Sequence, residues 1–100
     1  MIVATFKKIN KHITNVTTVG HANYAPHGQD IVCASVSACL TGLLNEMERY
    51  STIKYRVESG DVRLAILNPS AETDILMEFV KHTLEDVARV YPNNVKVITE

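Results

Sequence analysis

The sequence predicts an α+β domain, a two-layer sandwich in which two helices cover one face of a mostly antiparallel sheet. Predicted strands occur in two pairs, the first of each pair with alternating apolar and polar residues, and each pair precedes a segment that predicts a helix. A short apolar segment near the end adds one more strand. The predicted order is therefore β-β-α-β-β-α-β, and it packs most simply with both helices on the same face of the sheet.

Length, composition and charge narrow the class of protein. The chain has 100 residues and 46% hydrophobic content, which suits a single domain over residues 1–100 with one core. No run of about 18 apolar residues is present, and residues 1–13 lack the pattern of a signal peptide, so we expect no membrane span and a cytoplasmic location. Ten Lys and Arg against 11 Asp and Glu give a formal charge of −1, which disfavours direct nucleic-acid binding.

The first two predicted strands form a hairpin. Residues 2–7 alternate between apolar and polar side chains, and Asn10 marks a turn over residues 8–11. Residues 13–19 are rich in Thr and Val, which favours a second strand paired with the first.

A long loop leads into the first helix. Residues 20–29 contain two glycines and a proline without periodicity, and this loop exceeds the usual connection of about four to six residues. Asp30 occupies the N-cap position of a helix that begins at Ile31. The chain is apolar or small as far as Leu44 and charged afterwards, which predicts a helix buried in its first half and solvated in its last turn.

The second half of the chain repeats the strand-strand-helix order. Residues 53–58 alternate, and Ser59-Gly60-Asp61 predicts a tight turn into a strand over residues 62–67. Asn68-Pro69 predicts a cap with proline at the first helical position. The apolar residues that then recur at helical spacing are Ile75, Leu76, Phe79, Val80, Leu84, Val87 and Val90. Residues 95–99 are the final strand.

Two histidines and two cysteines, His21, His27, Cys33 and Cys39, occur at equal intervals of six residues. Zinc ligands usually occur in pairs about two to four residues apart. Two cysteines six residues apart on one helix are rotated by roughly 240° and separated by roughly 9 Å, so a disulfide cannot join them. The spacing therefore predicts no metal site and no disulfide, and we expect no cofactor and a packed Cys39.

Cys33 falls in the first turn of a capped helix, where the dipole and the unpaired amides favour a thiolate. By position alone, a small core residue is the slightly favoured interpretation of Cys33. The loop upstream favours a nucleophile, because cysteine nucleophiles are generally paired with an imidazole, and either His21 or His27 could supply one. Ser37 lies one helical turn after Cys33, where its hydroxyl either supports the site or bonds back to the carbonyl of residue 33.

These residues resemble a family signature. Gly20-His21-Ala22, then Gly28, Asp30-Ile31-Val32-Cys33-Ala34 and Ser37-Ala38 match, in order, the motif of the ribosomal-processing cysteine proteases of the Prp family. That motif is glycine-histidine-alanine, a variable loop, glycine, any residue, aspartate-isoleucine-valine-cysteine-alanine, and a serine one helical turn on. The match spans about a fifth of the chain.

The resemblance implies a His-Cys dyad, in which His21 is the general base and Cys33 attacks a peptide carbonyl to form an acyl-enzyme. His27 belongs to the variable loop and is expected to take no part in catalysis. The positions that the resemblance marks as supporting ones are Gly20, Gly28, Asp30 and Ser37.

The resemblance also implies a substrate and an assembly. The substrate is a large-subunit ribosomal protein precursor with a short N-terminal extension that ends in aromatic residues, and the protease is a homodimer. The loop expected to move over the bound peptide comprises Ala22, Asn23, Tyr24, Ala25, Pro26, His27 and Gln29. Tyr24 and Leu40 are candidates for an apolar groove. The outer sheet face, with residues such as Val3, Thr5, Arg56 and Arg63, is mixed enough to be solvated or to form part of a dimer interface.

A second hypothesis from another class stays open. A small α+β module that binds a ribosomal protein or regulates translation, without catalysis, would leave Cys33 as a packed side chain.

Overall fold

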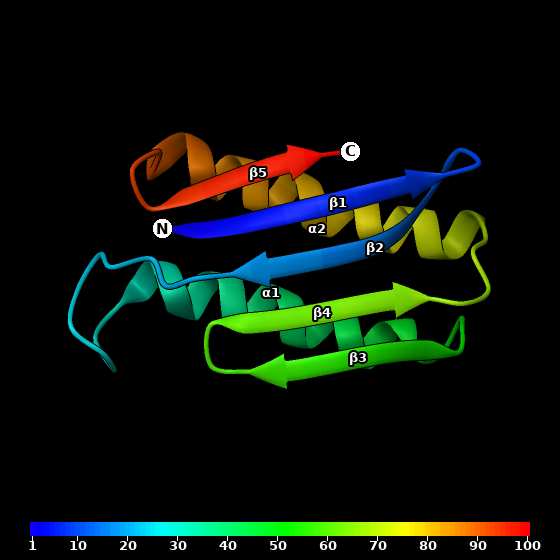
Figure 1. The fold of residues 1–100 in the computed structure, drawn as a ribbon, viewed down its shortest axis with the longest axis horizontal. Helices are drawn as coiled ribbons and strands as arrows, with labels where there is room; N and C mark the ends of the chain where they lie inside the picture. The colour runs from blue at the N-terminus through cyan, green and yellow to red at the C-terminus, as the bar shows by residue number, and fades with distance from the viewer.

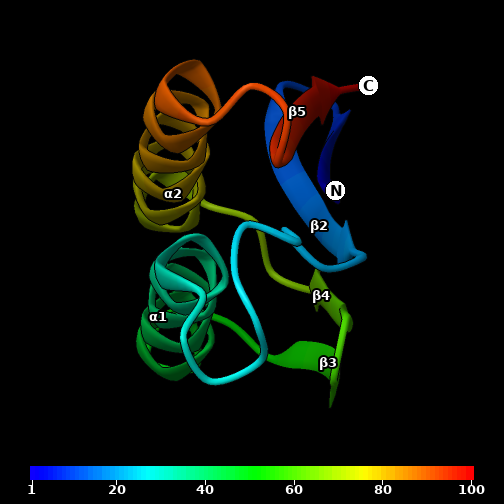
Figure 2. The same cartoon turned by 90° about the vertical axis from the view of Figure 1, so that its left-hand side faces the viewer.

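Five strands form one sheet in the order β3-β4-β2-β1-β5, and two helices cover one of its faces (Figure 1, Figure 2). The computed structural model describes residues 1–100 and confirms the predicted order of elements. The elements are β1 (Ile2–Ile9), β2 (His12–Val19), α1 (Ile31–Met47), β3 (Ile53–Glu58), β4 (Asp61–Ile66), α2 (Ala71–Val90) and β5 (Val95–Thr99).

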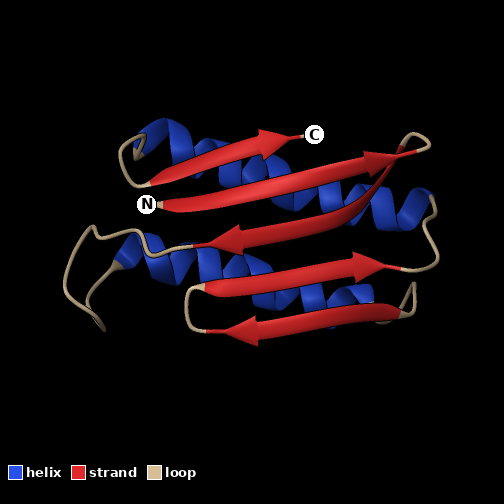
Figure 3. Ribbon diagram, in the orientation of Figure 1, coloured by secondary structure: helices blue, strands red, loops and turns tan.

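The sheet is mostly antiparallel, as predicted. The pairs β1–β2, β2–β4 and β3–β4 are antiparallel, and only β1 and β5 run parallel (Figure 3). The parallel pair arises because α2 returns the chain to the end of the sheet at which β1 begins. The α+β class is therefore confirmed.

The first hairpin is longer than predicted. Its turn consists of Asn10 and Lys11 alone, with φ angles of 51° and 71°. Two successive left-handed residues are the geometry of a type I′ turn, which matches the twist of the flanking strands. The strands extend to Ile9 and start at His12, so the predicted turn over residues 8–11 was wrong by two residues.

Helix α1 is buried along one face rather than in its first half. Its buried residues, spaced three or four apart over the whole length, are Val32, Val36, Leu40, Leu43 and Met47. Ile31 in the first turn is 58% exposed, whereas Met47 in the last turn is fully buried. The prediction was wrong because only one side of the helix meets the sheet, and small residues occupy the other side.

Helix α2 begins two residues later than predicted, at Ala71 and with a different cap. Ser70 is the N-cap, and its hydroxyl accepts from the Thr73 amide while the Thr73 hydroxyl accepts from the Ser70 amide. This reciprocal pair is a capping box. The predicted cap, Asn68, instead accepts a hydrogen bond from the amide of Thr52.

The apolar residues of α2 are divided between two faces. Met77 and Leu84 are fully buried in the core, but Ile75, Phe79 and Val90 are 67%, 69% and 66% exposed. Helical spacing of the apolar residues in this helix therefore does not place all of them in the core. An apolar strip of α2 remains in solvent.

The core lies between the sheet and the helices and positions the ends of several elements close together. Its largest fully buried side chains include Phe6, Ile13 and Met47. The other face of the sheet has no helix over it (Figure 2) and carries the ion pairs Arg56–Glu58 and Arg63–Asp61. Neither helix has the length and hydropathy that a membrane span needs.

Candidate active site

Cys33 lies in the first turn of α1, and Asp30 caps that turn as predicted. The Asp30 Oδ1 accepts from the amides of Val32 at 3.0 Å and Cys33 at 2.9 Å. The amide of Ala34 donates to the Asp30 carbonyl at 3.0 Å. The backbone N–H groups of residues 32–34 are therefore all occupied within the helix start.

The same carboxylate ties the loop to the helix. Asp30 Oδ2 accepts from the amides of Tyr24 at 2.9 Å and Ala25 at 3.3 Å. Four backbone hydrogen bonds to the carboxylate, the one from the Cys33 amide above all, hold the pKa of Asp30 below its usual range. Partial desolvation of the carboxylate acts in the opposite direction. Asp30 is thus a charged anchor for both sides of the site.

The first residues of the loop are held by contacts with the segment that connects α2 to β5. The Ala22 amide donates to Cys33 Sγ at 3.4 Å, and the Ala22 carbonyl accepts from Asn94 Nδ2 at 2.9 Å. The Tyr24 ring packs edge-on against Tyr91, with centroids 5.2 Å apart. Both partners lie between α2 and β5, and no sequence pattern places this connection at the site.

Ala22 and Tyr24 differ from the expectation for a substrate loop. Ala22 is 1% exposed and belongs to the core, so its side chain is closed to a peptide. Tyr24 lines neither of the two hollows beside Cys33. In this structure Tyr24 does not line the apolar groove, because its ring packs against Tyr91.

His21 lies against the turn between β3 and β4. Gly60 in that turn has φ +72°, and a Cβ built on it would lie 2.7 Å from His21 Nε2. The Gly20 amide donates to the Gly60 carbonyl at 2.9 Å, so the turn and the end of β2 are joined. The sequence predicts this tight turn but gives no sign that it supports the histidine.

Gly20 has a structural reason to be glycine. Its φ is +101°, and a Cβ there would collide with the carbonyl oxygen of Met1. The chain can therefore pass the N-terminus closely and bring His21 to the end of the sheet.

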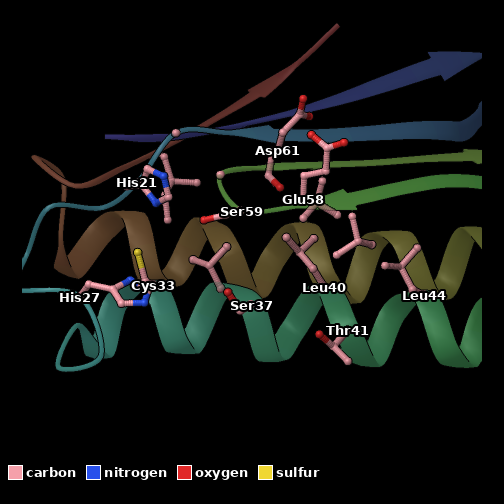
Figure 4. A pocket seen from close by; sticks show the side chains of 17 residues that line it. His21, His27, Cys33, Ser37, Leu40, Thr41, Leu44, Glu58, Ser59 and Asp61 are labelled. Atoms are coloured by element: carbon pink, nitrogen blue, oxygen red, sulfur yellow. The ribbon is translucent and has the colours of Figure 1, made fainter.

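Two hollows meet at Cys33. The helix groove, of about 400 Å³, runs along α1 beneath the β3–β4 turn (Figure 4), and its apolar lining includes Val36, Leu40, Leu44, Val57 and Val62. The loop hollow, of about 510 Å³, is bordered by Asn23, Ala25, Gly28, Asp30 and Ala34. The residues that line both are His21, His27, Cys33 and Ser37.

The nucleophile candidate and both imidazoles therefore border one open space. Figure 4 shows His21 on the sheet side of the groove, with Cys33 and His27 on the helix side. Neither imidazole is hydrogen-bonded to Cys33 Sγ, whose recorded partner is the Ala22 amide. Catalytic hydrogen bonds are often long in a free enzyme and tighten when substrate binds.

Ser37 is exposed and makes no hydrogen bond to the carbonyl of residue 33. The serine that bonds back to its helix is Ser35, whose hydroxyl donates to the Val32 carbonyl at 2.9 Å. The Ser37 hydroxyl is thus available to a molecule in either hollow.

Cys39 belongs to a different surface. It borders a small apolar hollow of about 280 Å³ between α1 and α2, and burial raises the pKa of its thiol. Both cysteines are free thiols. The structure contains no group of three or more His, Cys, Asp or Glu side chains placed to hold a metal ion.

A thiol in the first turn of a capped helix, with an imidazole across an open groove, is an arrangement typical of thiol-dependent hydrolases. Within that class, the chain belongs to the Prp family of cysteine proteases, since the family model for cysteine protease Prp matches residues 1–96. The chain is a cysteine protease.

Individual relatives agree with this assignment. The chain is 32% identical to the ribosomal processing cysteine protease Prp of Bacillus subtilis, over 99% of this chain and 97% of the relative. It is 33% identical to the protein of the same name from Mycoplasma pneumoniae, over 77% of this chain and 78% of the relative.

Solved structures share the fold. The Prp protease of S. aureus with a covalently linked product peptide has a TM-score of 0.94 at 22% identity, and all of both chains is covered. SMU.848 from Streptococcus mutans has a TM-score of 0.81 at 24% identity, covering 100% of this chain and 99% of the other.

Proposed function

We propose that this protein is an endopeptidase that removes the short N-terminal extension of a large-subunit ribosomal protein precursor. The observation that carries the proposal is the shared space of His21 and Cys33, with a hollow on either side through which a peptide can pass. The relatives from B. subtilis and M. pneumoniae are named ribosomal processing proteases, which supports the substrate class.

The proposed reaction uses a His-Cys dyad. His21 takes the thiol proton of Cys33, and the sulfur attacks the scissile carbonyl carbon. His21 then gives the proton to the leaving amine as the C–N bond breaks, leaving a thioester on Cys33. A water molecule, deprotonated by His21, hydrolyses the thioester and restores the free thiol.

Packing favours His21 over His27 as the base. His21 is followed by the buried Ala22 and lies against Gly60, so two neighbours limit its movement. Both histidines are exposed, but the loop around His27 has one backbone hydrogen bond, from the Gln29 amide to the Pro26 carbonyl. A general base has to be held in position, and this requirement favours the supported imidazole.

The helix groove suits the apolar part of the extension. Leu40 lines it, in agreement with its candidate role, and Leu44 and Val57 continue the apolar lining away from Cys33. The exposed loop residues 26–28 are the part free to close over the peptide, because Asp30 holds residues 24 and 25.

The proposal also includes a cytoplasmic homodimer, in line with the family resemblance. The exposed apolar side chains Ile75 and Phe79, beside the α1–α2 hollow, favour the helical face as the contact between two copies. The outer sheet face carries ion pairs and is the less apolar of the two candidates.

Cleavage of a synthetic precursor segment, carrying the extension and the first residues of the mature protein, tests the proposal. We expect wild type to cut it once, Cys33→Ala to leave it intact, and the matched Cys39→Ala variant to cut it at the normal rate. Binding without cleavage by wild type would favour the non-catalytic module, and cleavage by Cys33→Ala would contradict the dyad.

A further inference from the structure

We infer that the backbone N–H of Ala22 is the oxyanion donor of this protease and that Asn94 is the residue that positions it. The inference rests on the proposed function, because it assigns parts to the same reaction. An acyl transfer develops negative charge on the carbonyl oxygen, and preorganised donors aimed at that oxygen are usually a large term in catalysis.

The amides of residues 32–34 at the helix start are already engaged. A nucleophile at the start of a helix commonly has free amides beside it, but here the amides of Val32 and Cys33 donate to Asp30 Oδ1. The amide of Ala34 donates to the Asp30 carbonyl. These three amides are therefore less available to the oxyanion than a donor whose partner is the Cys33 sulfur itself.

The Ala22 amide is in the required place. It donates to Cys33 Sγ at 3.4 Å, so it already faces the reacting sulfur. When the sulfur bonds to the carbonyl carbon, charge leaves the sulfur and appears on an oxygen two bonds away. The Ala22 N–H can therefore exchange the sulfur for this oxygen as its hydrogen-bond acceptor with only a small change of direction.

Asn94 fixes the Ala22 residue from its other side. Its Nδ2 donates to the Ala22 carbonyl at 2.9 Å, across 72 residues of sequence. The backbone of Asn94 is itself held in place. Its N–H donates to the Tyr91 carbonyl at 3.0 Å, and its backbone carbonyl accepts from the Ile2 N–H at 2.8 Å. The Ala22 methyl group lies in the core. The donor is thus rigid before substrate arrives, as electrostatic catalysis requires.

The first test exchanges the amide of Asn94 for a carboxylate. Asn94→Asp keeps the shape of the side chain but cannot donate to the Ala22 carbonyl, and we expect kcat for the precursor peptide to fall about tenfold with KM nearly unchanged. Asn93→Asp makes the same charge change at the exposed neighbour and should retain the wild-type kcat. Equal loss in both variants, or none in Asn94→Asp, would overturn the role of Asn94.

The second test removes the N–H itself. Because Cys33 allows ligation of residues 1–32 to residues 33–100, the full chain can be assembled with an ester in place of the His21–Ala22 peptide bond. We expect kcat about 10²- to 10³-fold below that of the ligated all-amide chain. A loss smaller than about tenfold would overturn the inference.

Alkylation separates this inference from the proposed function. The reaction of iodoacetamide with Cys33 forms no oxyanion, so its rate in the ester chain should stay within about threefold of the control while kcat falls. If alkylation and kcat fall together, the amide acts on the thiol and the inference is overturned. If the all-amide chain cuts no peptide, the proposed function itself fails.

Discussion

The imidazole of His21 lies directly on Gly60, with no room for a side chain between them. A Cβ at position 60 would be 2.7 Å from Nε2 and 3.0 Å from Cε1 of the ring. The turn that joins β3 to β4 is therefore a support for the proposed general base, although it lies 39 residues further along the chain.

Gly60→Ala should reduce activity through His21. The added methyl group pushes the imidazole out of position, and part of the contribution of a general base, about 10²- to 10⁴-fold, is lost. We expect kcat for the precursor peptide to fall at least about tenfold. Left-handed φ at residue 60 also adds strain of about 1 kcal/mol, seen as a lower melting temperature.

Gly42→Ala is the matched control for that change. Gly42 lies in α1 with open space around its Cβ position. Alanine should stabilise the helix by about 0.5–1 kcal/mol and leave kcat unchanged. Full activity of Gly60→Ala would contradict the supporting role of the turn.

The two histidines of the site should differ sharply. His21→Ala removes the supported imidazole, and kcat should fall by about 10²- to 10⁴-fold. His27→Ala should keep kcat within about threefold of wild type, since the loop imidazole has no fixed partner. Steady-state cleavage of the precursor peptide measures both, and the reverse order would assign the base to His27.

Asp30 should make stability depend on pH in a definite direction. Because the folded-state pKa of Asp30 lies below its usual value of 3.8, the stability that its carboxylate contributes is present above that pH and is lost as the pH falls below it. Asp30→Asn should therefore melt below wild type at neutral pH, and the difference should close in acid. Asp86→Asn, in an exposed pair with Arg89, serves as the control and should show little difference at any pH.

The helix groove should govern binding rather than turnover. Val57 lines the groove and is 59% exposed, so Val57→Asp can be made without disturbing the core. We expect KM for the precursor peptide to rise about tenfold with kcat nearly constant, as for an interaction equal in ground and transition states. Tyr55→Asp is the control, because Tyr55 lies two residues earlier in β3, is 61% exposed and does not line the groove. Equal effects of the two variants would place the peptide elsewhere.

The proposed dimer should depend on the exposed face of α2. Phe79→Glu should convert a dimer to a monomer in analytical ultracentrifugation, because a charge would be buried at the contact. Thr5→Glu, on the outer sheet face, should leave the dimer intact. A dimer broken by Thr5→Glu and not by Phe79→Glu would move the interface to the sheet.

The part of the site encoded by neighbouring residues could be predicted from the sequence. Asp30 and Cys33 are three residues apart, and the geometry of a helix start determines what the carboxylate meets. The strand and helix periods likewise predicted the order of all seven elements. The boundaries of the elements were less certain. Asn68 and Ser70 are equally good N-caps by residue type, and only the structure shows that the helix starts after Ser70.

The contacts made across the fold could not be predicted. Asn94 reaches Ala22 and Gly60 reaches His21 only because the ends of three elements meet, and neither residue carries a local signal of that meeting. The exposure of Phe79 was missed for a related reason. Helical spacing shows that a face is apolar, but the width of the face that the sheet covers depends on the packing of α1 beside α2.

The two cysteines of α1 allow the most direct test of the central claim, that Cys33 is an activated nucleophile. Iodoacetamide at limiting concentration is added to the folded protein, and mass spectrometry of peptides gives the rate at each thiol. We expect Cys33 to react faster than free cysteine and faster than Cys39, whose thiol has a pKa raised by burial. We also expect the rate at Cys33 to fall in His21→Ala. A Cys33 that reacts no faster than Cys39 or free cysteine would contradict the claim.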